Sequence, residues 1–265
     1  MEAEGRIVMK RTPINDLHLW QFDGLASETS IRHFVTERNS VTDGKEFTLS
    51  FSSSPDKNEI RENRRRLAIA MGIADNDLRF PSQVHKTRIV HVERQTPKED
   101  LMETDALITN EKGICIAVMS ADCVPILLFD KQSKTVAAVH SGWRGTVARI
   151  LALTLEELKT VYGTKGKDIV AAIGPSVSQD SYEVGSEVVD AVLSTFGKSS
   201  DLMISRPDNK AKLDLWKANK LQLLEFGVDP SCIEISDMCT VKNNTSFFSA
   251  RKGDAGRFAA GIMLV

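Results

Sequence analysis

The 265-residue chain lacks several features that would assign it to a special class of protein. No apolar run reaches the roughly 20 residues needed to span a bilayer. The opening stretch Met1–Pro13 carries charges but no apolar segment of the signal-peptide type. The net charge of −2 creates no field that would attract nucleic acid or an acidic membrane surface. We therefore expect a cytoplasmic protein that binds neither nucleic acid nor membranes.

Cysteine is also scarce, with only Cys115, Cys123, Cys232 and Cys239 in the whole chain. So few thiols in a chain of this length, without a secretion signal, do not build a disulfide framework. We expect reduced thiols, of which Cys115, Cys232 and Cys239 are packing residues. The sequence carries no sign of its oligomeric state, and a homodimer is only a working expectation.

The hydrophobic pattern indicates a layered α/β domain that occupies residues 1–265. Three continuous apolar runs, Ile114–Met119, Val124–Phe129 and Thr135–His140, predict strands buried on both faces. Further strands are predicted over Leu17–Phe22, Ile31–Thr36, Phe47–Phe51, Arg88–Val92, Asp105–Thr109, Asp168–Ile173, Ile233–Ile235 and Gly261–Val265. Helices are predicted over Asp56–Met71, Gly145–Tyr162, Ser186–Phe196 and Leu215–Phe226, each followed by glycine. Because strands and helices do not alternate strictly, the sheets should be mixed.

Three side chains stand where predicted strands meet turns. His85 precedes a strand, Cys123 lies in the turn between two buried strands, and His140 ends the second of them. Consecutive strands are usually neighbours, so Cys123 and His140 can emerge at one sheet edge. A thiolate with two imidazoles is a zinc-type ligand set, and three protein ligands leave a fourth position open for chemistry. The other histidines, His18, His33 and His91, lie in or beside strand-like stretches.

Two basic, glycine-bearing segments are candidates for binding an anion. The turn Ser141–Gly145 runs into a helix, where backbone amides attract anions and Arg144 can fork onto phosphate or carboxylate. The segment 247–257 carries Arg251 and Arg257 and precedes the last strand. Either segment can equally be a structural turn or a solvated loop.

Ordered motifs along the chain resemble one known family from about Phe34 to Val265. It was first described as multicopper polyphenol oxidoreductase (laccase), and later as zinc-dependent purine nucleoside phosphorylase and adenosine deaminase. The matching pieces are Glu62-Asn63-Arg64-Arg65, Gln83-Val84-His85, Thr104-Asp105-Ala106, Ala121-Asp122-Cys123-Val124-Pro125, Val139-His140-Ser141-Gly142-Trp143-Arg144-Gly145, Ile173-Gly174-Pro175, Tyr182-Glu183-Val184-Gly185, Cys239-Thr240, Phe248-Ser249-Ala250-Arg251 and Gly256-Arg257.

The resemblance implies a fold, a metal site and an activity. The fold is a four-layer α/β/β/α arrangement, and the family's metal ligands fall on His85, Cys123 and His140. The implied activity is phosphorolysis of adenosine, inosine and methylthioadenosine, together with deamination of adenosine to inosine. Phosphorolysis requires a bound phosphate, for which the resemblance adds Arg38 to the candidates Arg144, Arg251 and Arg257.

The chain departs from the family pattern around the expected pocket. The family usually has a Gly-Gly pair after Thr-x-Arg, whereas Asn39-Ser40 follows Thr36-Glu37-Arg38 here. The family's Leu-Asn-Leu is Leu49-Ser50-Phe51, and Lys86 follows His85 where glycine is common. These positions bear on substrate preference.

A multicopper laccase is excluded by its histidine requirement, and two other functions compete with this interpretation. A true multicopper laccase needs roughly ten histidines for its copper sites, and the chain has five, although Cu²⁺ can occupy the same three ligands in vitro. A cysteine hydrolase would use Cys123 as nucleophile and His140 as base, with Asp122 orienting the imidazole. The second alternative is a non-catalytic, zinc-containing binding protein.

Overall fold

The computed structural model describes residues 8–41, 44–54, 56–197 and 201–265, so the first seven residues of the opening stretch lie outside the described residues. The strands are β1 (Met9–Ile14), β2 (Leu17–Phe22), β3 (Ile31–Val41), β4 (Leu78–Arg79), β5 (Ile89–His91), β6 (Ala106–Thr109), β7 (Cys115–Ser120), β8 (Val124–Asp130), β9 (Thr135–Ser141), β10 (Ile169–Ile173), β11 (Glu183–Val184), β12 (Met203–Ser205), β13 (Ala211–Leu213), β14 (Ile233–Ile235) and β15 (Phe258–Leu264). The α-helices are α1 (Asp23–Ala26), α2 (Lys57–Met71), α3 (Trp143–Val147), α4 (Ile150–Tyr162), α5 (Ser186–Phe196) and α6 (Leu215–Glu225).

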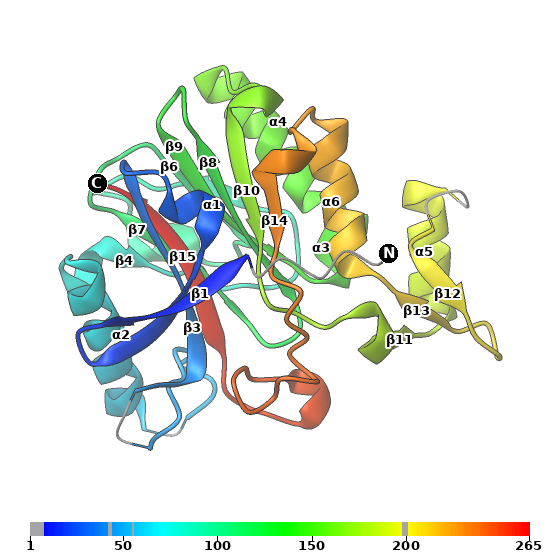
Figure 1. The fold of residues 1–265 in the computed structure, drawn as a ribbon, viewed down its shortest axis with the longest axis horizontal. Helices are drawn as coiled ribbons and strands as arrows, with labels where there is room; N and C mark the ends of the chain where they lie inside the picture. The colour runs from blue at the N-terminus through cyan, green and yellow to red at the C-terminus, as the bar shows by residue number, and fades with distance from the viewer. Residues whose placement is uncertain (1–7, 42–43, 55, 198–200) are drawn as a thin grey trace.

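Two six-stranded mixed sheets form the centre of the molecule (Figure 1). The first has the order β1-β2-β3-β15-β7-β4 and the second the order β14-β10-β8-β9-β6-β5. Most neighbours are antiparallel, but β4 pairs with β7, β5 with β6 and β10 with β14 in parallel. A small third sheet, β11-β13-β12, lies beside α5.

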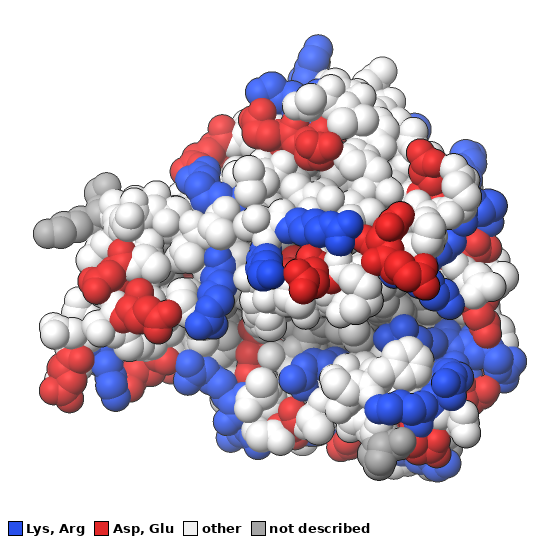
Figure 2. Space-filling view, turned by 180° about the vertical axis from the view of Figure 1, so that it is seen from behind, with Lys and Arg blue, Asp and Glu red and all other residues white. Residues whose placement is uncertain are grey.

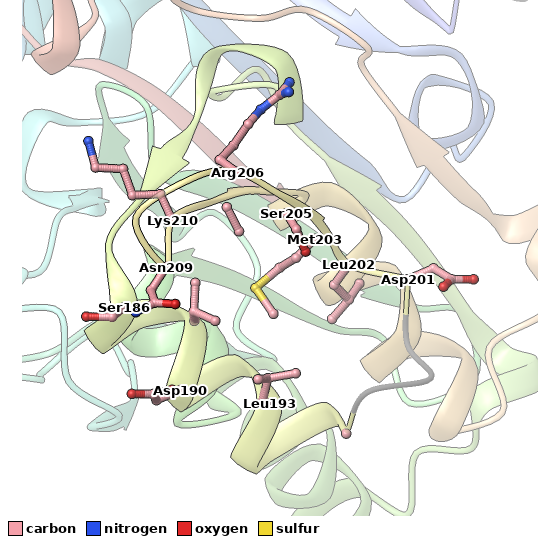
Figure 3. A pocket seen from close by; sticks show the side chains of 13 residues that line it. Ser186, Asp190, Leu193, Asp201, Leu202, Met203, Ser205, Arg206, Asn209 and Lys210 are labelled. Carbon is pink, nitrogen blue, oxygen red and sulfur yellow. The ribbon is translucent and has the colours of Figure 1, made fainter.

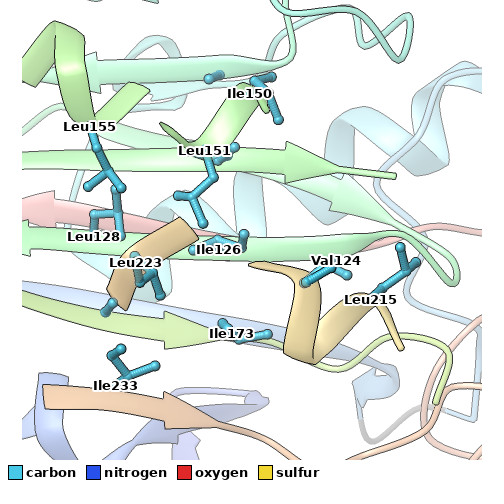
Figure 4. Packing of buried hydrophobic residues seen from close by; sticks show 14 of the residues in the cluster. Val124, Ile126, Leu128, Ile150, Leu151, Leu155, Ile173, Leu215, Leu223 and Ile233 are labelled. Atoms are coloured by element: carbon cyan, nitrogen blue, oxygen red, sulfur yellow. The ribbon is translucent and has the colours of Figure 1, made fainter. Parts of the chain in front are cut away.

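The layers follow from three buried apolar clusters. One cluster lies between the two large sheets and includes residues of both, such as Ile116 and Ile262 from the first and Phe129 and Ala172 from the second. A second cluster packs α4 and α6 on the outer face of the second sheet (Figure 4). The third packs α2 on the outer face of the first sheet. The predicted α/β/β/α arrangement with mixed sheets is therefore confirmed.

Local sequence signals explain where the helices begin and end. The Asp56 carboxylate caps α2 by accepting the amides of Asn58 and Glu59, and Gly72 ends it in the left-handed conformation with φ 73°. Asp214 caps α6 in the same way by accepting the Lys217 amide. These are the boundaries that the sequence predicts.

Strands β8 and β9 bring the predicted site residues to one edge. Both strands are buried along their whole length, with alternate side chains in the two clusters on either side, as their continuous apolar runs predict. They pair directly, with Pro125 opposite His140. Cys123, just before β8, therefore comes out beside the end of β9.

Several predicted boundaries are wrong. Phe47–Phe51 is not a strand: Phe47 and Leu49 are buried as in a strand, but side chains of α2 take the carbonyls of Thr48 and Leu49. The helix predicted over Gly145–Tyr162 is two helices, because Arg149 has φ 60° and interrupts it. β15 begins at Phe258 rather than Gly261, and β1, β4, β11, β12, β13 and α1 were not predicted. Within the described residues, no helix combines the length and apolar character that crossing a membrane requires.

His33 on β3 makes the stability of this fold sensitive to acid. Its Nε2 accepts the Phe22 amide at 2.8 Å, and burial lowers the pKa of His33 from 6.5 to about 4. Between pH 4 and pH 6.5, His33 therefore binds a proton in the unfolded chain but not in the folded chain. The contribution of the neutral His33 to the free energy of unfolding is complete above pH 6.5 and is lost as the pH falls toward 4. Between pH 7.5 and pH 5, the free energy of unfolding measured in urea should fall by about 2 kcal/mol more in wild type than in His33→Gln. Equal losses in both proteins would contradict this assignment.

Candidate metal centre

Three possible ligand atoms converge where β8 begins and β9 ends. One nitrogen each from His85 and His140 and the sulfur of Cys123 all lie within 4.8 Å of one another. The Cys123 Sγ is 3.7 Å from His85 Nε2, and the two imidazole rings meet edge to face with centroids 4.8 Å apart. His140 is buried, Cys123 is half-buried and His85 is exposed. The predicted trio therefore comes together around one point that solvent can reach.

The Asp105 carboxylate organises this point. It is fully buried, and its Oδ1 lies 2.9 Å from His140 Nδ1, which leaves Nε2 of that ring to face the cluster. The same carboxylate accepts the consecutive backbone amides of Val84, His85 and Lys86. His85 has φ 62°, an unusual value for a residue with a side chain, and the hydrogen bonds from these backbone amides hold it in that conformation.

Opposite charges tune the ionisation of the trio. Burial alone would raise the pKa of the Cys123 thiol, but the facing rings of His140 and His85 lower it to about 6. Burial would lower the pKa of His140, yet Cys123 and Asp105 raise it to about 9. Without a metal, Cys123 and His140 are therefore a thiolate and an imidazolium near neutral pH. A thiolate is the form of cysteine that binds metal ions.

Gly142 supplies the space for these side chains. A Cβ at this position would lie 2.8 Å from Cys123 Sγ and 3.1 Å from His85 Cδ2. The residue has φ −71° and ψ 177°, which any amino acid can adopt, so the constraint on it is steric. Glycine is needed here because the backbone passes directly against the trio.

The trio lies in a cavity of 830 Å³ with a cationic lining. Among the described residues, four basic side chains line it, Arg64, Lys98, Arg251 and Arg257, against one carboxylate, that of Asp122. Figure 2 shows one face of the molecule with a hollow between two lobes, along which Lys and Arg side chains and some Asp and Glu side chains lie. Such a cavity suits an anion beside the metal centre.

The two C-terminal arginines predicted to bind an anion line this cavity, and the other two predicted arginines are placed elsewhere. Arg251 lies over the Tyr182 ring at 4.6 Å, and Arg257 holds three carbonyls of its own loop. Arg38 is bound by the Asp254 carboxylate at 2.5 Å. Arg144 stacks on its neighbour Trp143 at 4.2 Å, and neither Arg38 nor Arg144 is among the described residues that line the cavity.

Asp122 does not orient His140, contrary to the expectation for a cysteine hydrolase. Its carboxylate accepts the Thr240 hydroxyl at 2.6 Å and the Arg251 amide at 2.8 Å, which ties two C-terminal loops to the turn before β8. Asp105 is the orienting carboxylate instead. No role for Asp105 or Arg64 was predicted from the sequence; the only signal for either residue is its place in the motifs of the family resemblance.

Comparison with known proteins identifies the family. The family described as multi-copper polyphenol oxidoreductase laccase matches residues 32–265. The chain belongs to this family. A relative named purine nucleoside phosphorylase, from Bacteroides thetaiotaomicron, is 37% identical over 94% of this chain and 97% of its own length. A relative named adenosine deaminase RL5, from an unknown prokaryotic organism, is 36% identical over 93% of this chain and 98% of its own.

Solved structures agree with this membership. The crystal structure of YlmD from Geobacillus stearothermophilus superimposes with a TM-score of 0.87 at 27% sequence identity, covering 98% of this chain and 99% of that one. The Bacillus licheniformis hypothetical protein YfiH gives the same TM-score at 23% identity, which supports the fold alone. The layered arrangement is therefore the arrangement of the family.

A second cavity of 650 Å³ lies between α5 and the strands β12 and β13 (Figure 3). Leu193, Leu202 and Met203 point into it, whereas Arg206 and Lys210 point away. Its described lining residues include none of those around the metal centre.

Replacing Gly142 with alanine tests the steric constraint at the trio. The added Cβ meets Cys123 Sγ, so Gly142→Ala should weaken zinc binding by at least about tenfold in a chelator competition. Gly185→Ala is the matched control, because Gly185 also begins a helix, has φ −83° and ψ 177°, and has open space around its Cβ position. Equal zinc affinity in both variants would refute the constraint.

Replacing Asp105 with asparagine tests the orienting carboxylate. The amide cannot accept both from His140 and from the amides of residues 84–86, so Asp105→Asn should lower zinc affinity by about 10- to 100-fold. Asp130→Asn is the control, since Asp130 is a buried carboxylate on β8 that accepts turn amides away from the site. Wild-type zinc affinity in Asp105→Asn would show that the carboxylate only stabilises the backbone of residues 84–86 and does not orient His140 for the metal.

Proposed function

We propose that this chain is a zinc-dependent purine nucleoside enzyme, acting through one domain that spans residues 1–265. With phosphate, it would convert adenosine, inosine and methylthioadenosine to the free base and ribose 1-phosphate or methylthioribose 1-phosphate. With water, it would convert adenosine to inosine and ammonia. The observation that carries the proposal is a three-ligand His-Cys-His cluster opening on a cationic cavity, in a chain whose near full-length relatives are named for these two activities.

The residues present fit a zinc ion. A thiolate and two imidazoles match the preference of zinc, and an open cavity beside three ligands is the pattern of catalytic rather than structural sites. His140 is fixed by a carboxylate on its other nitrogen, the usual support for a zinc-bound histidine. When bound by His85, Cys123 and His140, zinc supplies Lewis-acid chemistry that activates water near neutral pH. Cu²⁺ would occupy the same ligands in vitro.

The side chains of the cavity would hold the substrates. Arg251 and Arg257 would supply positive charge that holds the phosphate dianion in place for attack on the sugar carbon. Their guanidinium groups are already braced by backbone carbonyls, so little ordering is needed on binding. Contributions from Arg38 and Arg144, and the cytoplasmic location, stay predictions from the sequence.

A cysteine hydrolase is the second candidate, because one feature of the site favours it. Cys123 and His140 form a thiolate–imidazolium pair, and Asp105 holds the far nitrogen of the imidazole. His85 separates the two functions: a hydrolase of this type needs one imidazole, whereas the metal site uses both.

The decisive experiment measures metal content and products together. Protein purified without added zinc should contain about one zinc per chain, and both zinc and activity should be lost in Cys123→Ala and in His85→Ala. Incubation with inosine or adenosine and phosphate should release hypoxanthine or adenine with ribose 1-phosphate, and adenosine alone should give inosine. His18→Ala is the control, because this imidazole lies on β2 outside the cavity.

Each alternative predicts a different result in this experiment. The cysteine hydrolase would be established by three results together. The purified protein would contain no metal, the His85→Ala variant would stay active, and alkylation of Cys123 would abolish activity. Zinc-loaded protein that forms no product even at high concentration would establish a binding role instead.

A further inference from the structure

Phe51 is a large apolar side chain left exposed inside the cavity. It lies between α2 and the turn after β3, lines the cavity, and keeps 38% of its surface accessible. The Arg64 guanidinium covers one face of its ring, with Cζ 4.4 Å from the ring centroid. Phe51 therefore borders the cavity with part of its surface accessible while Arg64 stacks on its ring.

Arg64 is fixed in place and cannot easily swing away from Phe51. Its guanidinium lies between two rings, Phe51 and Phe80, at 4.4 Å from each centroid. Its Nε and one terminal nitrogen both donate to the Leu49 carbonyl, at 2.9 and 2.7 Å. Burial lowers the pKa of Arg64 to about 10, so it remains a cation at neutral pH. The stack is therefore a rigid cation between two aromatic rings.

The turn that carries Phe51 is braced by hydrogen bonds on both sides. The Ser53 hydroxyl donates to the Ser50 carbonyl at 2.6 Å, and it lies 2.6 Å from the Thr48 hydroxyl. The Asn63 amide of α2 donates to the Thr48 carbonyl at 3.0 Å. Phe51 is therefore presented on a preorganised segment, which limits the entropy lost when a ligand binds.

A short chain of contacts connects this stack to the metal centre along one wall. Arg64 reaches the Met119 sulfur at 3.9 Å. The Gln83 side chain then binds the backbone of Met119 through both of its polar atoms, each at 2.8 Å. Gln83 is two residues from His85, and all of these residues line the cavity. The ring of Phe51 and the metal ligands therefore belong to one continuous surface.

We propose that Phe51, backed by Arg64, is the stacking platform for the flat heteroaromatic base of the substrate. The inference rests on the proposed function for the identity of that base as a purine. An aromatic ring that stacks on a cation and keeps accessible surface in a cavity can offer its π-surface to a second flat ring. Phosphate does not stack on an aromatic ring; it binds the basic side chains of the same cavity instead. Phe51 is thus a substrate-positioning residue, and it stands where the family pattern has leucine.

The test separates stacking from apolar contact. Phe51→Leu keeps an apolar side chain but removes the ring, and should raise the KM for inosine and adenosine by about tenfold with kcat changed less than about twofold. The inhibition constant of free hypoxanthine should rise by the same factor, and the KM for phosphate should stay unchanged. Phe51→Trp should restore the wild-type values. Zinc content should be equal in all variants.

Ile69→Ala is the control, because Ile69 is an exposed apolar residue of α2 that does not line the cavity. If Phe51→Leu leaves the KM for both nucleosides at the wild-type value, the platform is refuted while the proposed activity stands. If the wild-type protein acts on no nucleoside, the proposed function fails, and the platform is judged by equilibrium dialysis with adenine. Adenine binding that is lost in Phe51→Leu and kept in Phe51→Trp would then support it, and no binding to wild type would overturn it.

Discussion

The Asp105 carboxylate is the group on which the geometry of the candidate metal centre depends. It has no exposed surface, so its charge is stabilised only by what it binds, and its partners come from both sides of the site. Three of them are backbone amides of the segment that carries His85, and the fourth is the ring nitrogen of His140. One buried charge thereby sets the position of one ligand and the orientation of another. The preference for burying a charge only when it is fully paired makes the arrangement specific.

The pairing of strands in the second sheet places Cys123 at the site and brings Asp105 within reach of His140. Asp105 directly precedes β6, which pairs with β9, so its carbonyl accepts the His140 amide while its side chain meets the His140 ring. β8 pairs with the other side of β9 and places Cys123 at the same edge. Three adjacent strands in one register therefore fix three of the four groups. His85 alone does not adjoin these three strands: it lies between β4 and β5, where the Asp105 carboxylate fixes it by accepting the amides of residues 84–86.

The parts of this fold that the sequence predicted are those governed by local rules. The apolar runs of β7, β8 and β9 and the caps of α2 and α6 depend on residues close in sequence, and their elements were correctly predicted. Phe47–Phe51 has the alternation of a strand, but Asn63 and Arg64 of the following helix α2, 15 residues along the chain, bind its carbonyls. The position of Arg38 likewise depends on Asp254, more than 200 residues away. Such long-range partners leave no periodic signal.

The family description as a multi-copper oxidoreductase conflicts with the placement of the remaining histidines. His33 is buried in β3, where its nitrogen accepts a backbone amide, and a metal ion there would break that bond. His91 binds Tyr162 and Glu157 through its two nitrogens, so neither is left for an ion. A cluster of copper ions needs roughly ten imidazole ligands on neighbouring ions, whereas the trio here contributes two imidazoles. The trio offers ligands for one ion, and the chemistry we propose for one ion beside an open cationic cavity is that of a Lewis acid with a bound anion.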